Sequence, residues 1–162
     1  MALFPPAPLG GEQVAHGYKS KGVLSHLLSD AQGHPLAWMS TAANGDERLQ
    51  VQPLLQKVNA YLPKDEHNEP IILEADRGYD ARSLRRSLLS QLIYPLIPYR
   101  RMKFRPGYKL EMTSFRWRIE RTFSWLKVRY RRFLCRFEKS IAAWQALLDC
   151  VLIHYWLQNL ER

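Results

Sequence analysis

Ile71-Ile-Leu-Glu-Ala75, the run that leads into Asp76-Arg-Gly-Tyr-Asp80, decides the fold class of this 162-residue chain. A short apolar run followed by a Gly-containing turn is typical of a buried strand. Residues 81–90 then show helical character with Asp80 as a plausible N-cap, and Leu92–Pro98 form a second short apolar run. Strand, helix and strand in this order indicate an α/β fold, a mixed sheet flanked by helices.

The remaining elements are predicted from the same periodicities. Residues 1–21 are rich in Pro and Gly and are expected to form an irregular lead-in, so that residues 22–162 make one domain. With 46% apolar residues the chain can build a real core. The other expected elements are a hairpin of Val23–Ser29 and Pro35–Thr41, a helix over Arg48–Leu62, a long helix that includes Thr113–Lys127, and a packing helix over Ser140–Leu160.

The long helix carries one acid in a defined setting. Arg116, Glu120 and Lys127 stand at positions i, i+4 and i+11, which places them within about 40° of one another around a helix. An apolar row beside them should pack on the core. This row consists of Phe115, Ile119, Phe123, Leu126, Tyr130 and Phe133, and we expect Trp125 and Trp144 to be core residues as well.

Positive charge is concentrated in one segment. Of the 24 Lys and Arg residues 14 lie between Arg100 and Lys139, against three acids there, whereas the rest of the chain is slightly acidic. Such a footprint is expected of a surface for nucleic acid or for an anionic membrane, and the aromatic residues among the cations favour nucleic acid. A merely solvated face is the alternative, although arginines without acids would repel one another. The expected DNA-contacting residues are Arg118, Arg121, Arg129, Arg132 and Arg136, together with Arg116, Lys127 and Arg131 beside the acid.

Other classes of protein are disfavoured. No apolar run approaches the ~20 residues of a spanning helix, and Met1–Pro8 lacks the basic region and apolar core of a signal peptide. Cys135 and Cys150 lack metal-ligand spacing, as expected of free thiols in a reducing cytoplasm.

Asp76 and Glu120 are the candidate catalytic and metal-binding residues. Asp76 follows a predicted strand, and functional crevices of α/β sheets lie outside the carboxyl ends of strands. Each acid has a simpler explanation: Asp76 could only stabilise its turn, and Glu120 could only pair with Arg116. Their combination with a basic surface favours a site for Mg²⁺ or Mn²⁺ that acts on a phosphodiester, with carboxyl groups about 4–8 Å apart.

At these residues the chain resembles the DDE-type insertion-sequence transposases, in particular the type-four and type-five group with a Tyr-Arg-Glu-Lys signature. In that pattern Tyr, two residues, Arg, three residues, Glu, six residues and Lys follow one another, and Arg116, Glu120 and Lys127 keep the spacing. Ala-Asp-Arg-Gly-Tyr-Asp-Ala81 is similar to the family's second Asp motif. The signature Tyr is replaced by Thr113.

The resemblance implies a ribonuclease-H-like fold, Mg²⁺-dependent cleavage at element ends and transfer of the freed 3′-hydroxyl to target DNA. It also implies a homodimer on DNA in a bacterial, nucleoid-associated setting. The family's first catalytic Asp and its strand would fall at or before Met1, where no acid is present. We therefore expect a partial catalytic domain that is inactive alone, binds DNA and exposes a sheet edge, and whose missing strand could come from an upstream reading frame. The alternative is a non-catalytic nucleic-acid-binding protein, either a transposase remnant or a regulator.

Overall fold

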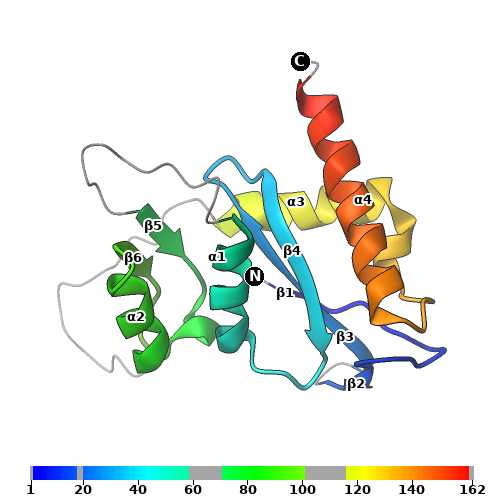
Figure 1. Cartoon of the computed structure of the whole chain (residues 1–162), viewed down its shortest axis with the longest axis horizontal. Coiled ribbons are helices and arrows are strands. Elements are labelled where there is room, and N and C mark those ends of the chain that lie inside the picture. The colour runs from blue at the N-terminus through cyan, green and yellow to red at the C-terminus, as the bar shows by residue number, and fades with distance from the viewer. Residues whose placement is uncertain (1, 18–19, 59–70, 101–115, 161–162) are drawn as a thin grey trace.

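The computed structural model describes residues 2–17, 20–58, 71–100 and 116–160, which form a mixed α/β fold (Figure 1). The element order agrees with the predicted order of hairpin, helix, strand, helix, strand and two helices. The strands are β1 (Ala2–Leu3), β2 (Ala15–His16), β3 (Lys21–Ser29), β4 (Pro35–Ala42), β5 (Ile71–Glu74) and β6 (Ile93–Leu96). The α-helices are α1 (Val51–Val58), α2 (Arg82–Leu89), α3 (Arg116–Arg129) and α4 (Ile141–Leu160).

The first sheet is built on the predicted hairpin. β3 and β4 pair antiparallel from Val23 opposite Ala42 to Ser29 opposite Pro35. The turn between them requires Gly33, which has a φ of +94° and lies so close to α3 that a Cβ would be 3.0 Å from the Thr122 hydroxyl. The other edge of β3 is partly covered by β1 and β2.

These two short strands lie within the segment that was expected to be irregular. Ala2 pairs with His26 and Ala15 with Gly22, both antiparallel to β3. The pairing satisfies backbone N–H and C=O groups that would otherwise remain open along this edge. The expected irregular lead-in therefore contains two short strands, at residues 2–3 and 15–16.

The main core lies between this sheet and helices α3 and α4. Trp38 of β4 contacts the rings of Phe123 and Phe133, at centroid distances of 5.9 and 4.7 Å. Trp144 of α4 is fully buried, and its indole N–H donates to the Ser40 hydroxyl over 2.9 Å. Trp125 is only partly buried against this core. The core residues are Val23, Leu27, Trp38, Phe123, Leu126, Phe133, Trp144, Leu148 and Val151.

A second, smaller unit is formed by β5, α2 and β6. β5 and β6 are parallel, in register from Ile71 opposite Ile93 to Glu74 opposite Leu96. Leu84 and Leu88 of α2 pack on this pair. Helix α1 joins the two units, because Val51 and Leu55 pack on the second unit, whereas Leu54 and Val58 pack on Ala37 of β4.

Two predicted helix boundaries differ from the structure. Asp80 does not cap α2: the capping position is Ala81, and the Asp80 carboxylate accepts instead from Arg85 Nε and from the backbone N–H of Arg100. Helix α3 ends at Arg129, and residues 131–134 form a separate 3₁₀ turn. This turn directs Phe133 into the core. The row of arginines on α3 therefore does not continue to Arg136.

Within the described part of the chain, no helix is both long enough and apolar enough to span a membrane.

Candidate active site

A groove of about 360 Å³ separates the two sheets. One wall is the end of β3 and the residues after it, and the other is β5 with the turn that follows. Ile119 of α3 and Val51 of α1 also line this inter-sheet groove. Apolar side chains dominate the lining, yet Asp30, Glu47, Glu74 and Asp76 are also part of it.

Asp76 lies at the carboxyl end of β5, as the sequence predicts. It is the N-cap of the 3₁₀ turn Arg77–Tyr79, and its Oδ1 accepts from the backbone N–H of Gly78 over 2.6 Å. A Cβ on residue 78 would lie 2.7 Å from that oxygen, so a larger residue there would displace the Asp76 carboxylate from its present position. Asp76 therefore stabilises its turn and also faces the groove, and the two interpretations of this residue are compatible.

Glu120 is an exposed residue of α3. Its neighbour Ile119 lines the same groove as Asp76, so this part of the helix borders the groove. Lys127, further along the same helix, is half-buried. Thr113 and Phe115 lie outside the described residues, as does the side chain of Arg116. The predicted approach of Asp76 and Glu120 to metal-bridging distance stays a prediction.

The described residues do not complete a metal site. No three of their His, Cys, Asp or Glu side chains form a group that could hold an ion. The carboxylates of Asp76 and Glu120 have the oxygen chemistry that Mg²⁺ prefers, but they are only two. Glu12 and Asp30 already accept hydrogen bonds: Glu12 accepts from the N–H of Ile141, and Asp30 accepts from the N–H groups of Gln32 and His34 and from the His34 ring.

Two buried polar atoms in the groove lining, Glu74 Oε1 and His26 Nδ1, have no hydrogen-bond partner among the described residues. Burial raises the pKa of Glu74 above its usual value and lowers the pKa of His26 to about 4. The other ring nitrogen of His26 is satisfied by Thr41 Oγ1 at 2.7 Å. Sequence reasoning missed both residues, although an acid inside the apolar run Ile71–Ala75 was a signal for the first.

Three of the predicted DNA-contacting arginines are held by neutral acceptors. Arg121 donates to the carbonyl of Gln32 over 3.2 Å, Arg129 to Gln158 Oε1 over 2.7 Å, and Arg118 to the carbonyl of Ala31. The guanidinium of Arg121 also lies 4.7 Å from the Trp117 ring centroid. The hydrogen bonds of Arg121 and Arg129 orient these two cations through neutral acceptors.

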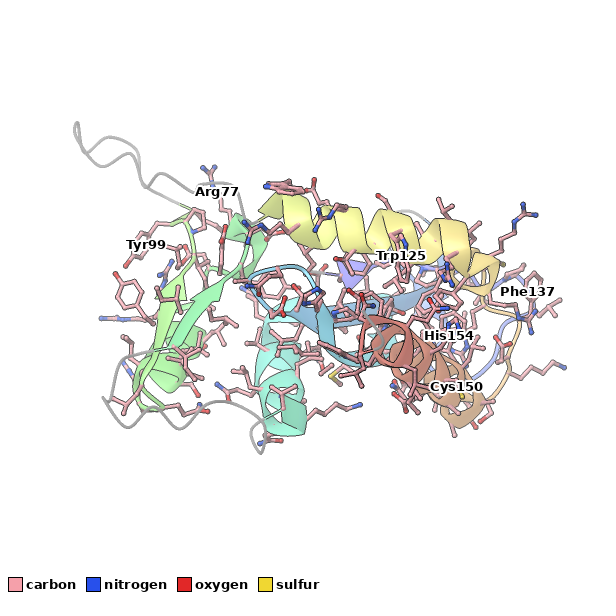
Figure 2. All side chains as sticks on the ribbon, turned by 90° about the horizontal axis from the view of Figure 1, so that it is seen from above. Arg77, Tyr99, Trp125, Phe137, Cys150 and His154 are labelled. Atoms are coloured by element: carbon pink, nitrogen blue, oxygen red, sulfur yellow. The ribbon has the colours of Figure 1, made fainter. Side chains whose placement is uncertain are left out.

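Arg121 and Arg129 line a cleft of about 260 Å³ between α3, α4 and the β3–β4 turn. Trp125, Tyr155 and Gln158 contribute to this cleft, and none of its lining residues is acidic. Figure 2 shows Trp125 on the side of α3 that is turned toward α4. The cleft is thus a positively charged surface beside an aromatic ring.

Two of the predicted DNA-contacting arginines, Arg136 and Arg132, differ from the others. Arg136 is fully buried, and its guanidinium donates to the backbone carbonyls of Glu138, Glu12 and Lys139. Burial lowers its pKa. Arg136 was expected among the DNA-contacting residues, but its side chain is not exposed, because helix α3 ends at Arg129. Arg132 is exposed but pairs with Glu138 at 2.7 Å, and Arg131 is exposed on the same turn.

Comparison with known proteins shows the family to which the chain belongs. Residues 6–156 match the family model described as "Transposase DDE domain". A Burkholderia cepacia protein, named as a transposase for insertion sequence element IS402, is 35% identical over 136 residues, which are 82% of this chain and 62% of that protein. The chain thus spans less than two thirds of this relative. No solved structure matches. Because the family model covers nearly the whole sequence, the chain belongs to the DDE transposase family.

Proposed function

We propose that this chain is part of the catalytic domain of an insertion-sequence transposase, which cuts DNA at the ends of its element and transfers the freed strand into target DNA. The observation that carries the proposal is the position of Asp76, at the end of β5 in a groove that α3 also borders. A basic surface on the same helix could hold the polyanion.

We further propose that the domain is ribonuclease-H-like and of the Tyr-Arg-Glu-Lys group, and that one strand is missing between its two sheets. β1 runs antiparallel to β3, with Ala2 opposite His26. A strand that continued β1 in the N-terminal direction would run beside Leu27 and Leu28, which line the inter-sheet groove. The unpartnered Glu74 Oε1 and His26 Nδ1 support an occupant with polar backbone groups. An upstream reading frame is the proposed source of this strand.

In this proposal Asp76 and Glu120 are two of the metal ligands, and the missing strand supplies a third acid. Divalent metal ions, Mg²⁺ or Mn²⁺, would clamp the attacking and leaving oxygens of the phosphodiester. Arg116, Lys127 and Arg131 would hold phosphates beside the cut. This chain alone is then expected to be inactive, since the described residues contain no three-ligand group.

The basic surface would bind the DNA backbone with little sequence preference. Its proposed members are Arg118, Arg121 and Arg129, with Arg132 as a weaker contact because of its pairing with Glu138. Arg136 is omitted because it is buried.

A first experiment tests the DNA-binding part. We expect the double variant Arg121→Gln/Arg129→Gln to bind a duplex of the element ends more weakly, and to lower the slope of log K against log salt by about 0.9 for each phosphate that is no longer neutralised. The matched control is Arg82→Gln/Arg86→Gln, which removes two exposed arginines from α2. Equal effects of the two double variants would show that only net charge matters.

A second experiment tests catalysis. The purified chain is incubated with DNA of the element ends and Mg²⁺ or Mn²⁺, alone and after N-terminal extension by the upstream coding sequence. We expect cleavage only by the extended protein, and its loss in Glu120→Gln. Cleavage by the short chain would contradict the missing-ligand proposal. If neither form cleaves while both bind DNA, the second candidate holds, a non-catalytic DNA-binding remnant or regulator. The absence of a three-ligand group among the described residues is the observation that favours this candidate.

A further inference from the structure

Helix α4 has two apolar faces, but the described part of the chain covers only one. Trp144, Leu148 and Val151 form the buried face. The opposite face nevertheless carries a continuous exposed row, which we name the α4 stripe. It consists of Ala143, Ala146, Cys150, Ile153, Leu157 and Leu160.

The α4 stripe has the spacing of a helix-pairing seam. Successive members are three, four, three, four and three residues apart, which is the heptad pattern. At 100° per residue the row occupies an arc of about 100°, centred opposite the buried face. Its large residues are well exposed: Ile153 by 61%, Leu157 by 56% and Leu160 by 77%.

Two views show how α4 lies relative to the rest of the fold. Figure 1 shows the C-terminal end of α4 projecting beyond the rest of the fold. Figure 2 shows Cys150 on the side of α4 that is turned away from α3. No residue of the row is charged, and Asp149 beside it is bound by the Gln145 side chain over 2.9 Å.

We propose that the α4 stripe pairs with the same stripe of a second copy of this chain, with the two helices antiparallel. The argument is the distribution of side-chain size along the row. The N-terminal half is small, with Ala143, Ala146 and Cys150, and the C-terminal half is large, with Ile153, Leu157 and Leu160. A two-fold axis near residues 151 and 152 places each small residue opposite a large one.

In this register three layers form on each side of the axis, with Ala143 opposite Leu160, Ala146 opposite Leu157, and Cys150 opposite Ile153 of the second copy. Such self-complementarity is the property of an isologous two-fold interface. A parallel pair would instead place large residues against large ones at one end and leave the small residues facing each other at the other. The seam is about 26 Å long, at the small end of specific interfaces, so the dimer should be weak and concentration-dependent.

Sedimentation of the full chain without DNA tests the interface separately from the proposed cleavage. We expect a shift from monomer to dimer with rising concentration, and its loss in Leu157→Glu, which puts two carboxylates into the seam. The control is Leu89→Glu, which changes an equally exposed leucine (54%) of α2 and should dimerise like the parent. A melting temperature of Leu157→Glu equal to that of the parent, at a concentration at which the parent is monomeric, shows that the fold is intact. A chain that is monomeric at every concentration, or a Leu157→Glu chain that still dimerises, overturns the proposal.

Cross-linking tests the register. In a Cys150→Ser background, Ala146→Cys/Leu157→Cys should oxidise to a covalent dimer, because the antiparallel pair brings residues 146 and 157 together. The single variants should not. A covalent dimer of Leu157→Cys alone would indicate parallel helices and overturn the antiparallel arrangement.

Discussion

The two sheets of this chain differ in how completely their residues find partners. The four-stranded sheet is covered by α3 and α4, and in its core the ring of Phe133 contacts the rings of both Trp38 and Trp144. The β5–β6 pair has only one strand partner per strand among the described residues, and its Glu74 carboxylate includes a buried oxygen without a hydrogen bond. The candidate acids thus border the incomplete boundary between the two units.

The largest expected effect is on the first unit. Trp144→Ala should lower the free energy of unfolding by about 3–5 kcal/mol, because it removes a fully buried indole and leaves a cavity. A decrease of this size is a large part of the stability of a small domain. Chemical denaturation measures it.

Trp117→Ala is the control, since this ring is about half exposed on α3 and should change stability by less than about 0.5 kcal/mol. If both variants unfold at the same denaturant concentration, the core around Trp144 does not carry the stability of the molecule.

A second test concerns His26, which stands on β3 at the wall of the groove. Burial lowers its pKa from 6.5 to about 4. Between these values the unfolded chain binds a proton that the folded chain does not bind, so stability is complete above pH 6.5 and falls as the pH drops toward 4. The decrease should be about 3 kcal/mol.

His26→Gln should remove most of this pH dependence, because the glutamine side chain does not titrate. The measurement is the free energy of unfolding at several pH values for both proteins. Identical pH profiles would show that the folded chain tolerates a charged His26. They would indicate that water reaches this side of the groove more than the burial of His26 suggests.

A third, smaller effect is expected at Glu74 on the opposite wall. Burial raises the pKa of this acid, so at neutral pH the folded state bears the cost of an ionised group without a full set of partners. Glu74→Gln should therefore stabilise the chain by about 1 kcal/mol or less at pH 7. Near pH 4 the effect should be small, because the side chain at position 74 is then mainly neutral in the folded parent as well as in the variant. If the variant is destabilising at pH 7, the carboxylate has a partner in solution and the boundary is more complete than the comparison of the two sheets indicates.

The sequence predicted the parts of the fold that depend on local patterns. The hairpin follows from Gly33 between two apolar runs, and Asp76 was correctly placed after a strand because an apolar run ends there. β1 and β2 were missed because two residues are too few to show a periodicity. Arg136 was misplaced because helical spacing continues past Arg129, whereas the need to bury Phe133 ends the helix there.

The smallest expected effect is a difference between Arg129 and Arg132 in DNA binding. The sequence predicts both as DNA-contacting residues. Arg129 donates to a neutral amide oxygen, whereas Arg132 is paired with the Glu138 carboxylate. Arg129→Gln should lower the salt slope of DNA binding by about 0.9, the value for one neutralised phosphate. Arg132→Gln should lower it by less, because part of that charge is already compensated. Fluorescence anisotropy over a series of salt concentrations measures both slopes. Equal reductions in slope would show that DNA displaces Glu138 from Arg132, and that the basic surface extends beyond the end of α3.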